Sequence, residues 1–443
     1  MNKKQSLVNL WLPAALSAAL TLLTATTALA QPTAKEGNKG LVGWNLGNQL
    51  ECPAPGMDGE SMVIGQSKNA INAETSWGNP VVTEATIKAI REAGFNAIRI
   101  PVRWGCHITN ASTMAIDPAW LERVKTIVDW SLAQGLKVIV NTHHDKWLEG
   151  RPTYAYQDEN NRRLALLWTH IAKAFAQYDY RLAFAGTNEV HVKDNWGKPS
   201  KENLTVQNSY NQAFVEAVRA TGGNNLRRHL IVQTYVCNPD FGLYNGDFVV
   251  PTDATGNGND YMSVEFHYYT PWDYAGECKY YFWGEAYRQY GATPTQGEKA
   301  MTDFFDRVAA TWADKGLGVV IGEWGVTDHY QAGKADIAHE NMTYYCRLLT
   351  TEALKRGFST FIWDNNAFGN GQEKFGIFDR RQGMKVKATW IMKGIAEGLA
   401  TGIGATTLGQ AVRPCATRKY LCEGSVYVSR NAERYNLLGQ QVD

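Results

Sequence analysis

The sequence predicts an α/β fold, a (β/α)8 TIM barrel with long loops on its C-terminal face. Eight short apolar runs that suit strands lie between residues 41 and 363. Most of these runs are separated by segments whose apolar residues recur at three- and four-residue spacing, the period of an amphipathic helix. Strands that alternate with helices form parallel sheets, and a count of eight favours a closed barrel over an open doubly wound sheet.

Each expected element is a short, continuous segment. The strands are expected at residues 41–45, 96–101, 137–141, 182–186, 230–234, 262–267, 318–322 and 359–363. The helices are expected at residues 83–93, 118–134, 162–177, 202–220, 298–313, 334–355 and 387–399. Pro118 suits the first turn of its helix, because proline lacks the N–H that the first turn leaves without an intrahelical partner.

Two of the loops that follow strands are long, residues 47–80 and residues 268–297. In this fold the loops after the strands build the active-site face. Nine of the eighteen residues at positions 266–283 are Phe, Tyr or Trp. Single rings among them can form a small local core, but we expect the segment as a whole to form a cleft wall that stacks on flat sugar rings.

The composition excludes some classes of partner. The 443 residues include 44 Lys and Arg against 43 Asp and Glu, a net charge of +1. This balance argues against a nucleic acid or an anionic membrane surface as the main partner. The 15 Trp, 21 Tyr and 15 Phe residues indicate a large core or a surface that stacks on flat ligands.

Residues 1–30 have the pattern of a signal peptide. Lys3 and Lys4 precede an apolar stretch at residues 10–23, and residues 28–30 (Ala-Leu-Ala) form a small-x-small cleavage site. A membrane anchor needs about 20 strongly apolar residues, whereas Ser and Thr dilute this stretch. We therefore expect an exported protein (secreted, periplasmic or at the cell surface) with no membrane insertion after cleavage.

The chain ends in a short segment of different composition. Residues 400–407 are small and Gly-rich, as in a linker, so we expect residues 401–443 to be a linker and a short C-terminal tail of unknown role. The chain contains seven cysteines, and an odd number leaves at least one thiol unpaired in a monomer. Only Cys415 and Cys422 are close in sequence, and we expect mainly buried free cysteines with one or two bridges at most.

Two glutamates, Glu189 and Glu323, stand at the ends of the expected fourth and seventh strands. An acidic residue at the carboxyl end of a barrel strand faces the cleft in which this fold carries out catalysis. A single glutamate there is more often structural. Two facing carboxylates, however, are what glycoside hydrolysis requires, one as acid and one as base or nucleophile.

Other strand ends carry polar and aromatic side chains. They are Arg99 on the second strand, His143 on the third, Asn188 on the fourth, His267 and Tyr269 on the sixth, and Trp363 on the eighth. Each of these alone is more typical of core packing than of function. The pair His143 and His144 could suggest a metal, but adjacent residues on a strand point to opposite faces. We expect no metal and no cofactor.

Together these residues resemble the motifs of glycoside hydrolase family 5, the cellulase family, in the order in which that family has them. Residues 43–48 (Gly-Trp-Asn-Leu-Gly-Asn) and 74–80 (Glu-Thr-Ser-Trp-Gly-Asn-Pro) extend the resemblance to about residues 40–395. The most similar branch contains endo-β-1,4-glucanases and xyloglucanases. The family commonly has Glu and Pro where this chain has Ala185 and Val190, and we expect this difference to alter the shape of the loop while the chemistry is kept.

The resemblance implies a role for each matched residue. Glu189 would be the general acid/base and Glu323 the nucleophile of a retaining double displacement, with carboxyl groups about 5–5.5 Å apart. Arg99 and Tyr269 would hold Glu323 ionised, and Asn188 would bind the sugar 2-hydroxyl. The remaining implied contacts are a polar ring completed by His143 and His267, a floor formed by Trp363, and platforms at neighbouring subsites formed by Trp104, Trp147 and Trp272.

We therefore expect residues 31–400 to form one catalytic domain, a monomer that hydrolyses internal bonds of a β-1,4-glucan. Cellulose-type chains, mixed-linkage glucan and xyloglucan are all compatible with the motifs. A β-mannanase or xylanase of the same fold is the alternative enzyme. A non-catalytic glycan-binding barrel would lack one of the glutamates, or the Arg or Asn beside one, and none is missing. A metal-dependent barrel hydrolase would be inhibited by EDTA.

Overall fold

The computed structural model describes residues 31–57, 64–65, 70–243 and 248–402, and the strands at residues 418–422, 425–430, 433–435 and 441–442. The expected signal peptide and most of the expected linker lie outside the described residues, and so does Cys415. Within the described part of the chain, no helix is long and apolar enough to cross a membrane.

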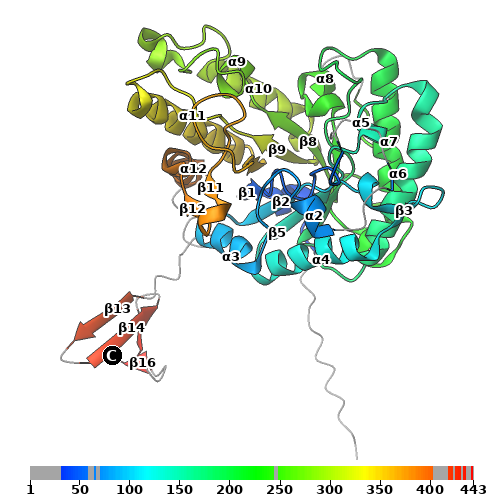
Figure 1. Ribbon diagram of the computed structural model, residues 1–443, viewed down its shortest axis with the longest axis horizontal. Coiled ribbons are helices and arrows are strands. Elements are labelled where there is room, and N and C mark those ends of the chain that lie inside the picture. Colours follow the sequence, from blue (N-terminus) through cyan, green and yellow to red (C-terminus); the bar gives the residue numbers. More distant parts are fainter. Residues whose placement is uncertain are drawn as a thin grey trace, which may run out of the picture. The chain divides into compact units, whose positions relative to one another are not determined.

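Eight parallel strands form a closed barrel (Figure 1). They are β1 (Val42–Asn45), β2 (Ala97–Ile100), β5 (Lys137–Asn141), β6 (Leu182–Ala185), β7 (Leu230–Gln233), β8 (Met262–Tyr268), β9 (Gly318–Trp324) and β10 (Ser359–Ile362). Each coincides with an expected strand to within two residues at either end. The last strand closes on the first through the pair Val42 and Thr360, which confirms the predicted fold class.

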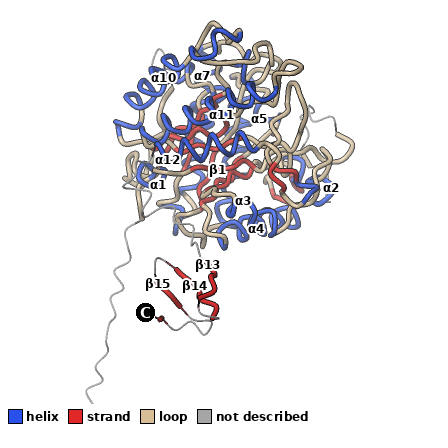
Figure 2. The backbone as a smooth tube through the Cα atoms, turned by 90° about the vertical axis from the view of Figure 1, so that its left-hand side faces the viewer, coloured by secondary structure: helices blue, strands red, loops and turns tan. Residues whose placement is uncertain are grey.

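Helices surround the barrel strands (Figure 2). The main ones are α3 (Glu84–Glu92), α4 (Pro118–Ala133), α6 (Tyr154–Ala174), α7 (Lys201–Arg219), α10 (Glu298–Thr311), α11 (Ala335–Lys355) and α12 (Thr389–Gly402). Pro118 does occupy the first turn of α4, and Asp117 caps it by accepting from the backbone N–H of Ala119 at 2.9 Å. Helix α6 begins eight residues before its expected start, because its first two turns are mostly exposed and lack an apolar period.

Short helices and two-stranded hairpins lie in the loops. They are α1 (Ala34–Asn38), α2 (Ala70–Glu74), α5 (Lys146–Glu149), α8 (Asp240–Leu243), α9 (Trp272–Ala275), and the hairpins β3 (Ile108–Asn110) with β4 (Ala115–Ile116) and β11 (Phe378–Asp379) with β12 (Lys385–Val386). The C-terminal segment has an antiparallel sheet of β13 (Arg418–Cys422), β14 (Ser425–Arg430), β15 (Glu433–Tyr435) and β16 (Gln441–Val442).

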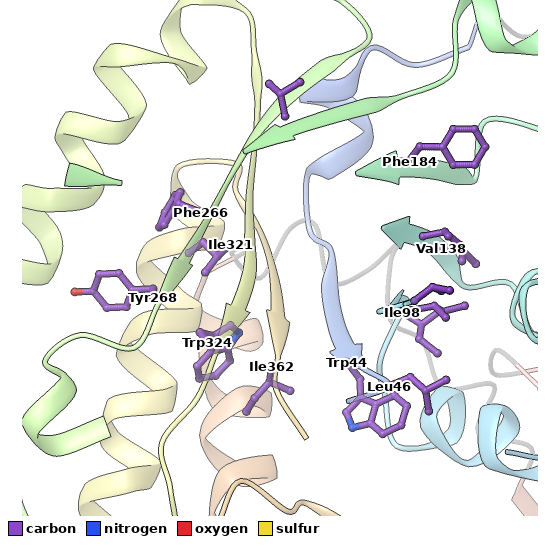
Figure 3. Close-up of a cluster of buried hydrophobic side chains, with 14 of the residues drawn as sticks. Trp44, Leu46, Ile98, Val138, Phe184, Phe266, Tyr268, Ile321, Trp324 and Ile362 are labelled. Atoms are coloured by element: carbon purple, nitrogen blue, oxygen red, sulfur yellow. The ribbon is translucent and has the colours of Figure 1, made fainter. Parts of the chain in front are cut away.

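The strands bury one face against the helices and the other inside the barrel, because successive side chains on a strand point to opposite faces. The outer side chains join the helices in the large apolar core, part of which Figure 3 shows. Seven inward side chains form a smaller apolar layer, Ala97, Ile139, Ala183, Ala185, Ile231, Val320 and Phe361. Fully buried polar side chains accompany this layer on the strands, among them Asn45, Arg99, Gln233 and Glu265.

A bulge in β9 determines where Glu323 points. Phe266 of β8 pairs with Ile321, but the next residue, His267, pairs with Glu323. Gly322 is therefore an extra residue in β9 that has no partner in β8. A bulge residue of this kind changes the face of the sheet to which the next side chain points. Without it, strict alternation from the inward Val320 would turn Glu323 away from the barrel axis; with it, Glu323 lies level with His267.

The close packing of the barrel interior gives a test. A Cβ at Gly43 would lie 2.1 Å from the Phe361 ring, so Gly43→Ala should lower the free energy of unfolding by about 1–3 kcal/mol, as overpacked cores do. Urea-induced unfolding followed by tryptophan fluorescence measures this. Gly297→Ala is the control, because nothing lies within 4 Å of the added methyl and replacing an N-cap glycine costs at most about 1 kcal/mol. Equal stability of the two variants would contradict the packing described here.

Candidate active site

The carboxyl ends of β6 and β9 bring the two predicted glutamates together. Glu189 lies in the loop after β6, and Glu323 lies near the end of β9. One oxygen of each carboxylate and one nitrogen of His267 lie within 4.8 Å of one another. His267 Nδ1 lies 2.6 Å from Glu189 Oε1 and 3.6 Å from Glu323 Oε2. The histidine therefore stands between the two carboxylates.

Two donors hold the Glu323 carboxylate. Arg99 Nη1 donates to Oε1 at 2.9 Å, and the Tyr269 hydroxyl donates to Oε2 at 3.1 Å. Glu323 is almost completely buried, whereas the side chain of Glu189 is 22% exposed. These are the contacts that the family resemblance implies for Glu323, and the greater exposure of Glu189 leaves it accessible to solvent.

The net effect of the surroundings on the acidity of Glu323 differs from the expectation. Burial raises the pKa of Glu323 above its ordinary value, and the Glu189 and Glu265 carboxylates act in the same direction. His267 and Arg99 lower the pKa, but they do not outweigh burial. The two donors orient the carboxylate oxygens of Glu323, and Arg99 limits a rise in pKa that burial would otherwise make larger.

Arg99 also fixes Asn188. Its Nη2 donates to Asn188 Oδ1 at 2.9 Å, and its Nη1 donates to Asn45 Oδ1 at 3.1 Å. Asn45 in turn donates to the carbonyl oxygen of Gly322 at 2.9 Å. Since the amide oxygen of Asn188 accepts from Arg99, the amide NH2 group is the part of this side chain that can donate to a ligand.

His143 and Trp363 form one side of the site. Their rings are stacked, with centroids 5.8 Å apart and planes inclined by 10°. His143 Nε2 lies 4.0 Å from Glu323 Oε1. Burial lowers the pKa of His143 well below its usual value, and the nearby His144 and Arg99 act in the same direction, so the neutral form of the His143 ring is favoured.

The loop of Glu189 is supported by the turn η3 (Tyr235–Cys237) that follows β7. Val236 donates its backbone N–H to the carbonyl of Val190 at 3.0 Å, and Cys237 Sγ lies 3.4 Å from the carbonyl oxygen of Asn188. Val236 has a φ of 60°, a left-handed conformation that is costly for a β-branched residue. Val190, one of the two departures from the family pattern, is fully buried beneath this turn, as is Ala185 in the barrel.

Sequence reasoning missed one acidic group of the site, Glu265. Its Oε1 lies 3.0 Å from Arg99 Nε and 3.5 Å from His267 Nε2, and Gln233 Nε2 donates to its Oε2 at 2.7 Å. Glu265 is fully buried. The signal that could have found it is the period of two in β8, which places Glu265 on the same face as His267.

The expectation that a tryptophan forms a sugar platform is wrong for two of the three residues, Trp104 and Trp147. Trp104 is fully buried and its indole N–H donates to the carbonyl of Asn141 at 3.1 Å, and Trp147 is only 3% exposed. Both rings belong to the apolar core, so neither offers a face to a ligand. Trp272, in contrast, is 52% exposed.

A cavity of about 540 Å³ opens beside the site. Its walls are residues 236–240, residues 267–270, Trp272, Gln296 and the side of α10 that carries Ala300, Phe304 and Arg307. Of the nine aromatic residues at positions 266–283, only Tyr268, Tyr269 and Trp272 line it. Others are buried, Tyr274 and Trp283 in the large apolar core and Phe282 in a small separate cluster. The expectation that the segment as a whole forms a cleft wall is therefore wrong.

Glu189, His267 and Glu323 are also spaced closely enough to hold a metal ion, the one such group in the described part of the chain. The buried Arg99 guanidinium lies 2.9 Å from Glu323 and would repel a cation. Burial disfavours a charged His267, but the Glu323 carboxylate and hydrogen bonds to Cys237 and Glu189 raise the pKa of His267 well above its usual value. A protonated histidine does not bind a metal, so this group fits a proton-transfer site better.

Two carboxylates at the strand ends of an α/β barrel, bridged by a histidine, define a glycoside-cleaving class of protein. The family profile Cellulase (glycosyl hydrolase family 5) matches residues 58–369. The chain therefore belongs to this family of glycoside hydrolases.

Three relatives illustrate the similarity. Endoglucanase A of Paenibacillus barcinonensis is 34% identical over 391 residues, which cover 84% of this chain and 89% of that protein. A Bacteroides ovatus GH5 xyloglucanase solved with a XXXG heptasaccharide has a TM-score of 0.73 and 30% identity, covering 83% of this chain and 76% of that one. A lichenase from Caldicellulosiruptor sp. F32, solved with cellotetraose, has a TM-score of 0.72 and 27% identity, and the match covers 84% of this chain and 96% of that one.

The contrast between the tryptophans gives a second test. Trp104→Ala should lower the free energy of unfolding by about 3–5 kcal/mol, because it leaves a large cavity in the core. Trp272→Ala should change it by less than about 0.5 kcal/mol, because the ring is half exposed. Urea unfolding of both variants measures the difference. A similar loss in the two variants would show that Trp272 is a core residue.

Proposed function

We propose that the chain is a retaining endo-β-1,4-glucanase in which Glu323 is the nucleophile and Glu189 the general acid/base. The observation that carries this proposal is the spacing of the pair, whose nearest oxygens lie within 4.8 Å. Inverting enzymes keep their carboxyl groups about 6.5–9.5 Å apart to admit a water molecule, whereas retaining enzymes keep them about 5–5.5 Å apart. The separation supports direct attack by one carboxylate.

In the first half of the reaction, a Glu323 oxygen attacks the anomeric carbon of the bound chain. The bond from that carbon to the leaving sugar oxygen breaks, and Glu189 gives its proton to this oxygen. Arg99 and Tyr269 each hold one Glu323 oxygen, which fixes the direction of attack. The product is an ester between Glu323 and the sugar.

In the second half, water attacks the same carbon and gives its proton to Glu189. The ester bond breaks, Glu323 leaves as a carboxylate, and the sugar is released with its original anomeric configuration. Glu189 acts as acid in one half and as base in the other. Its contact with His267 Nδ1 at 2.6 Å is suited to the second role, because a charged donor stabilises the carboxylate that exists between the two halves.

The remaining predicted residues bind the sugar. The NH2 group of Asn188 would donate to the 2-hydroxyl, where hydrogen bonds strengthen toward the transition state. Trp363, stacked on His143, would form the floor beneath the reacting sugar. The cavity beside His267 and Tyr269, with the exposed ring of Trp272, would hold sugars on the leaving-group side.

We propose an unbranched or branched β-glucan as the substrate. We also propose that the enzyme acts as a monomer. Its relatives include an endoglucanase, a xyloglucanase bound to a heptasaccharide and a lichenase bound to cellotetraose. This range supports cellulose-type chains, mixed-linkage glucan and xyloglucan alike. Mannan and xylan are the alternative substrates for the same residues.

The decisive experiment is reducing-sugar release by purified residues 31–443 and by the Glu323→Gln variant. The substrates are carboxymethyl cellulose, mixed-linkage glucan, xyloglucan, mannan and xylan. We expect activity on at least one glucan, and a loss of about a thousandfold or more in the variant, because the nucleophile is gone. NMR of the first product should show the original anomeric configuration.

The other possible results of this experiment would each contradict one part of the proposal. Activity on mannan or xylan alone would overturn the substrate, and activity that survives in Glu323→Gln would overturn the nucleophile. Binding without turnover would indicate a glycan-binding barrel, and inhibition by EDTA would indicate a metal-dependent hydrolase. As a control for the acid, Glu189→Ala should lose far less activity on a dinitrophenyl cellobioside than on a polymer, because that leaving group needs no proton.

We further propose that the protein is exported. The support is the charged start, the apolar stretch and the Ala-Leu-Ala site of residues 1–30. Expression of the full chain in a bacterial host should give a mature protein outside the cytoplasm whose first residue is Gln31, as N-terminal sequencing will show. A protein that keeps Lys3 and Lys4 and stays with the cytoplasmic fraction would contradict export.

A further inference from the structure

Glu265 lies behind the site, on the far side of two side chains that face the glutamate pair. Its Oε1 contacts Arg99 Nε at 3.0 Å and His267 Nε2 at 3.5 Å. The opposite ends of the same two side chains contact Glu323 and Glu189. Glu265 therefore touches both residues that hold the glutamate pair.

The position of Glu265 is fixed by its surroundings. Gln233 Nε2 donates to Oε2 at 2.7 Å, and the other end of the Gln233 amide accepts from the backbone N–H of Thr187 at 2.9 Å. A Cβ at position 322 would lie 1.7 Å from Oε1, so only glycine at this point of the bulge leaves room for the carboxylate.

The contacts of Oε1 act through charge. Among the described residues, neither Arg99 Nε, nor Glu265 Oε1, nor His267 Nε2 has an aligned hydrogen-bond partner, although the three atoms are close together. A buried charge without a counter-charge is strongly destabilising. The carboxylate is thus the compensating anion for a guanidinium and an imidazolium that are both shielded from water.

We propose that Glu265 is a positioning residue for the reaction: it fixes Arg99 and keeps His267 as an imidazolium throughout the catalytic cycle. This inference rests on the double displacement proposed above. It goes beyond that mechanism because it assigns a task to a third carboxylate, one that the attack and the proton transfer do not use.

The balance of charges explains why a third carboxylate is needed. Before attack, the cations are Arg99 and His267, and the anions are Glu323 and Glu265, with Glu189 protonated. After attack, Glu323 is an uncharged ester and Glu189 has become the anion. The cluster is neutral in both states, so His267 keeps its proton while the negative charge moves from one side of its ring to the other.

A charged His267 also directs the proton of Glu189. An imidazolium carries hydrogen on both ring nitrogens, so Nδ1 donates to Glu189 Oε1 at 2.6 Å. The proton that Glu189 transfers must then be on its other oxygen, Oε2. A neutral ring with its hydrogen on Nε2 would instead accept that proton at Nδ1 and divert it from the leaving oxygen.

The pKa shifts of Glu265 and His267 agree with a charged Glu265 and a charged His267. Burial opposes ionisation of Glu265, but Arg99, His267 and Gln233 outweigh it and hold its pKa below the usual value. The pKa of His267 is raised despite burial, as described above. The ionisable groups around His267 are Arg99, His143, Glu189, Cys237, Glu265, Tyr269 and Glu323.

The test is Glu265→Gln, which keeps the shape of the side chain and removes its charge. The imidazolium is present below the pKa of His267 and is lost as the pH rises through it. Removing an anion lowers this pKa, so the alkaline limb of the kcat profile should move to lower pH. At the optimum, kcat should fall about 10- to 100-fold, as for a misplaced catalytic group, with KM changed less than about twofold because Glu265 does not touch substrate.

Asp253→Asn is the matched control, because Asp253 is also a buried carboxylate, paired with Arg219 at 2.8 Å, and lies outside the site. It should lose stability but keep the wild-type pH profile. The inference is overturned if Glu265→Gln also keeps that profile and loses only stability. Retention of anomeric configuration by the wild type, measured in parallel, separates this failure from a failure of the double displacement.

A second measurement does not depend on the folding of any Glu265 variant. In the wild-type protein labelled with 15N-histidine, NMR at neutral pH should show both nitrogens of His267 protonated, with the signal assigned by its loss in His267→Gln. A neutral His267 ring would overturn the inference. Glu265→Asp, which keeps the charge, should restore most of the pH profile that Glu265→Gln loses.

Discussion

The structure of the site depends on one buried cation, the guanidinium of Arg99. It lies fully buried inside the barrel and contacts Asn45, Asn188, Glu265 and Glu323. A guanidinium has five N–H donors and does not lose its charge in proteins, so the barrel must surround it with acceptors and at least one anion. Its neighbours on β1, β8 and β9 and in the loop after β6 are polar for this reason, and two of them, Asn188 and Glu323, are residues that we propose bind and cleave the glycan.

The same constraint shapes the backbone. Two carboxylates cannot meet the guanidinium from neighbouring strands by strict alternation, because Glu323 would then point outward. The bulge at Gly322 turns Glu323 inward, and the missing Cβ of Gly322 leaves the space that Glu265 fills. One residue thus turns Glu323 inward and leaves room for the second carboxylate beside Arg99, at the cost of a local break in the ladder between β8 and β9.

The sequence predicted the eight strands well, because each is a short apolar run in a regular βα alternation. It also predicted Glu189 and Glu323, since strand ends of a barrel converge whatever the details of packing. It could not predict which tryptophans are exposed: Trp104 and Trp272 follow strands alike, and only tertiary contacts bury the first. Nor could it foresee the bulge, since a single extra residue leaves no trace in an apolar pattern.

The thiol of Cys237 lies against the carbonyl of Asn188, at the base of the loop that carries Glu189. Burial raises the pKa of this thiol to about 12, and the thiolate, not the thiol, is the nucleophile that reacts with oxidants and disulfides. If the protein is exported, as we propose, it meets extracellular oxidants, and a sulfenic acid or a mixed disulfide at this point would disturb the loop that carries Glu189. Burial of this unbridged thiol therefore disfavours its oxidation.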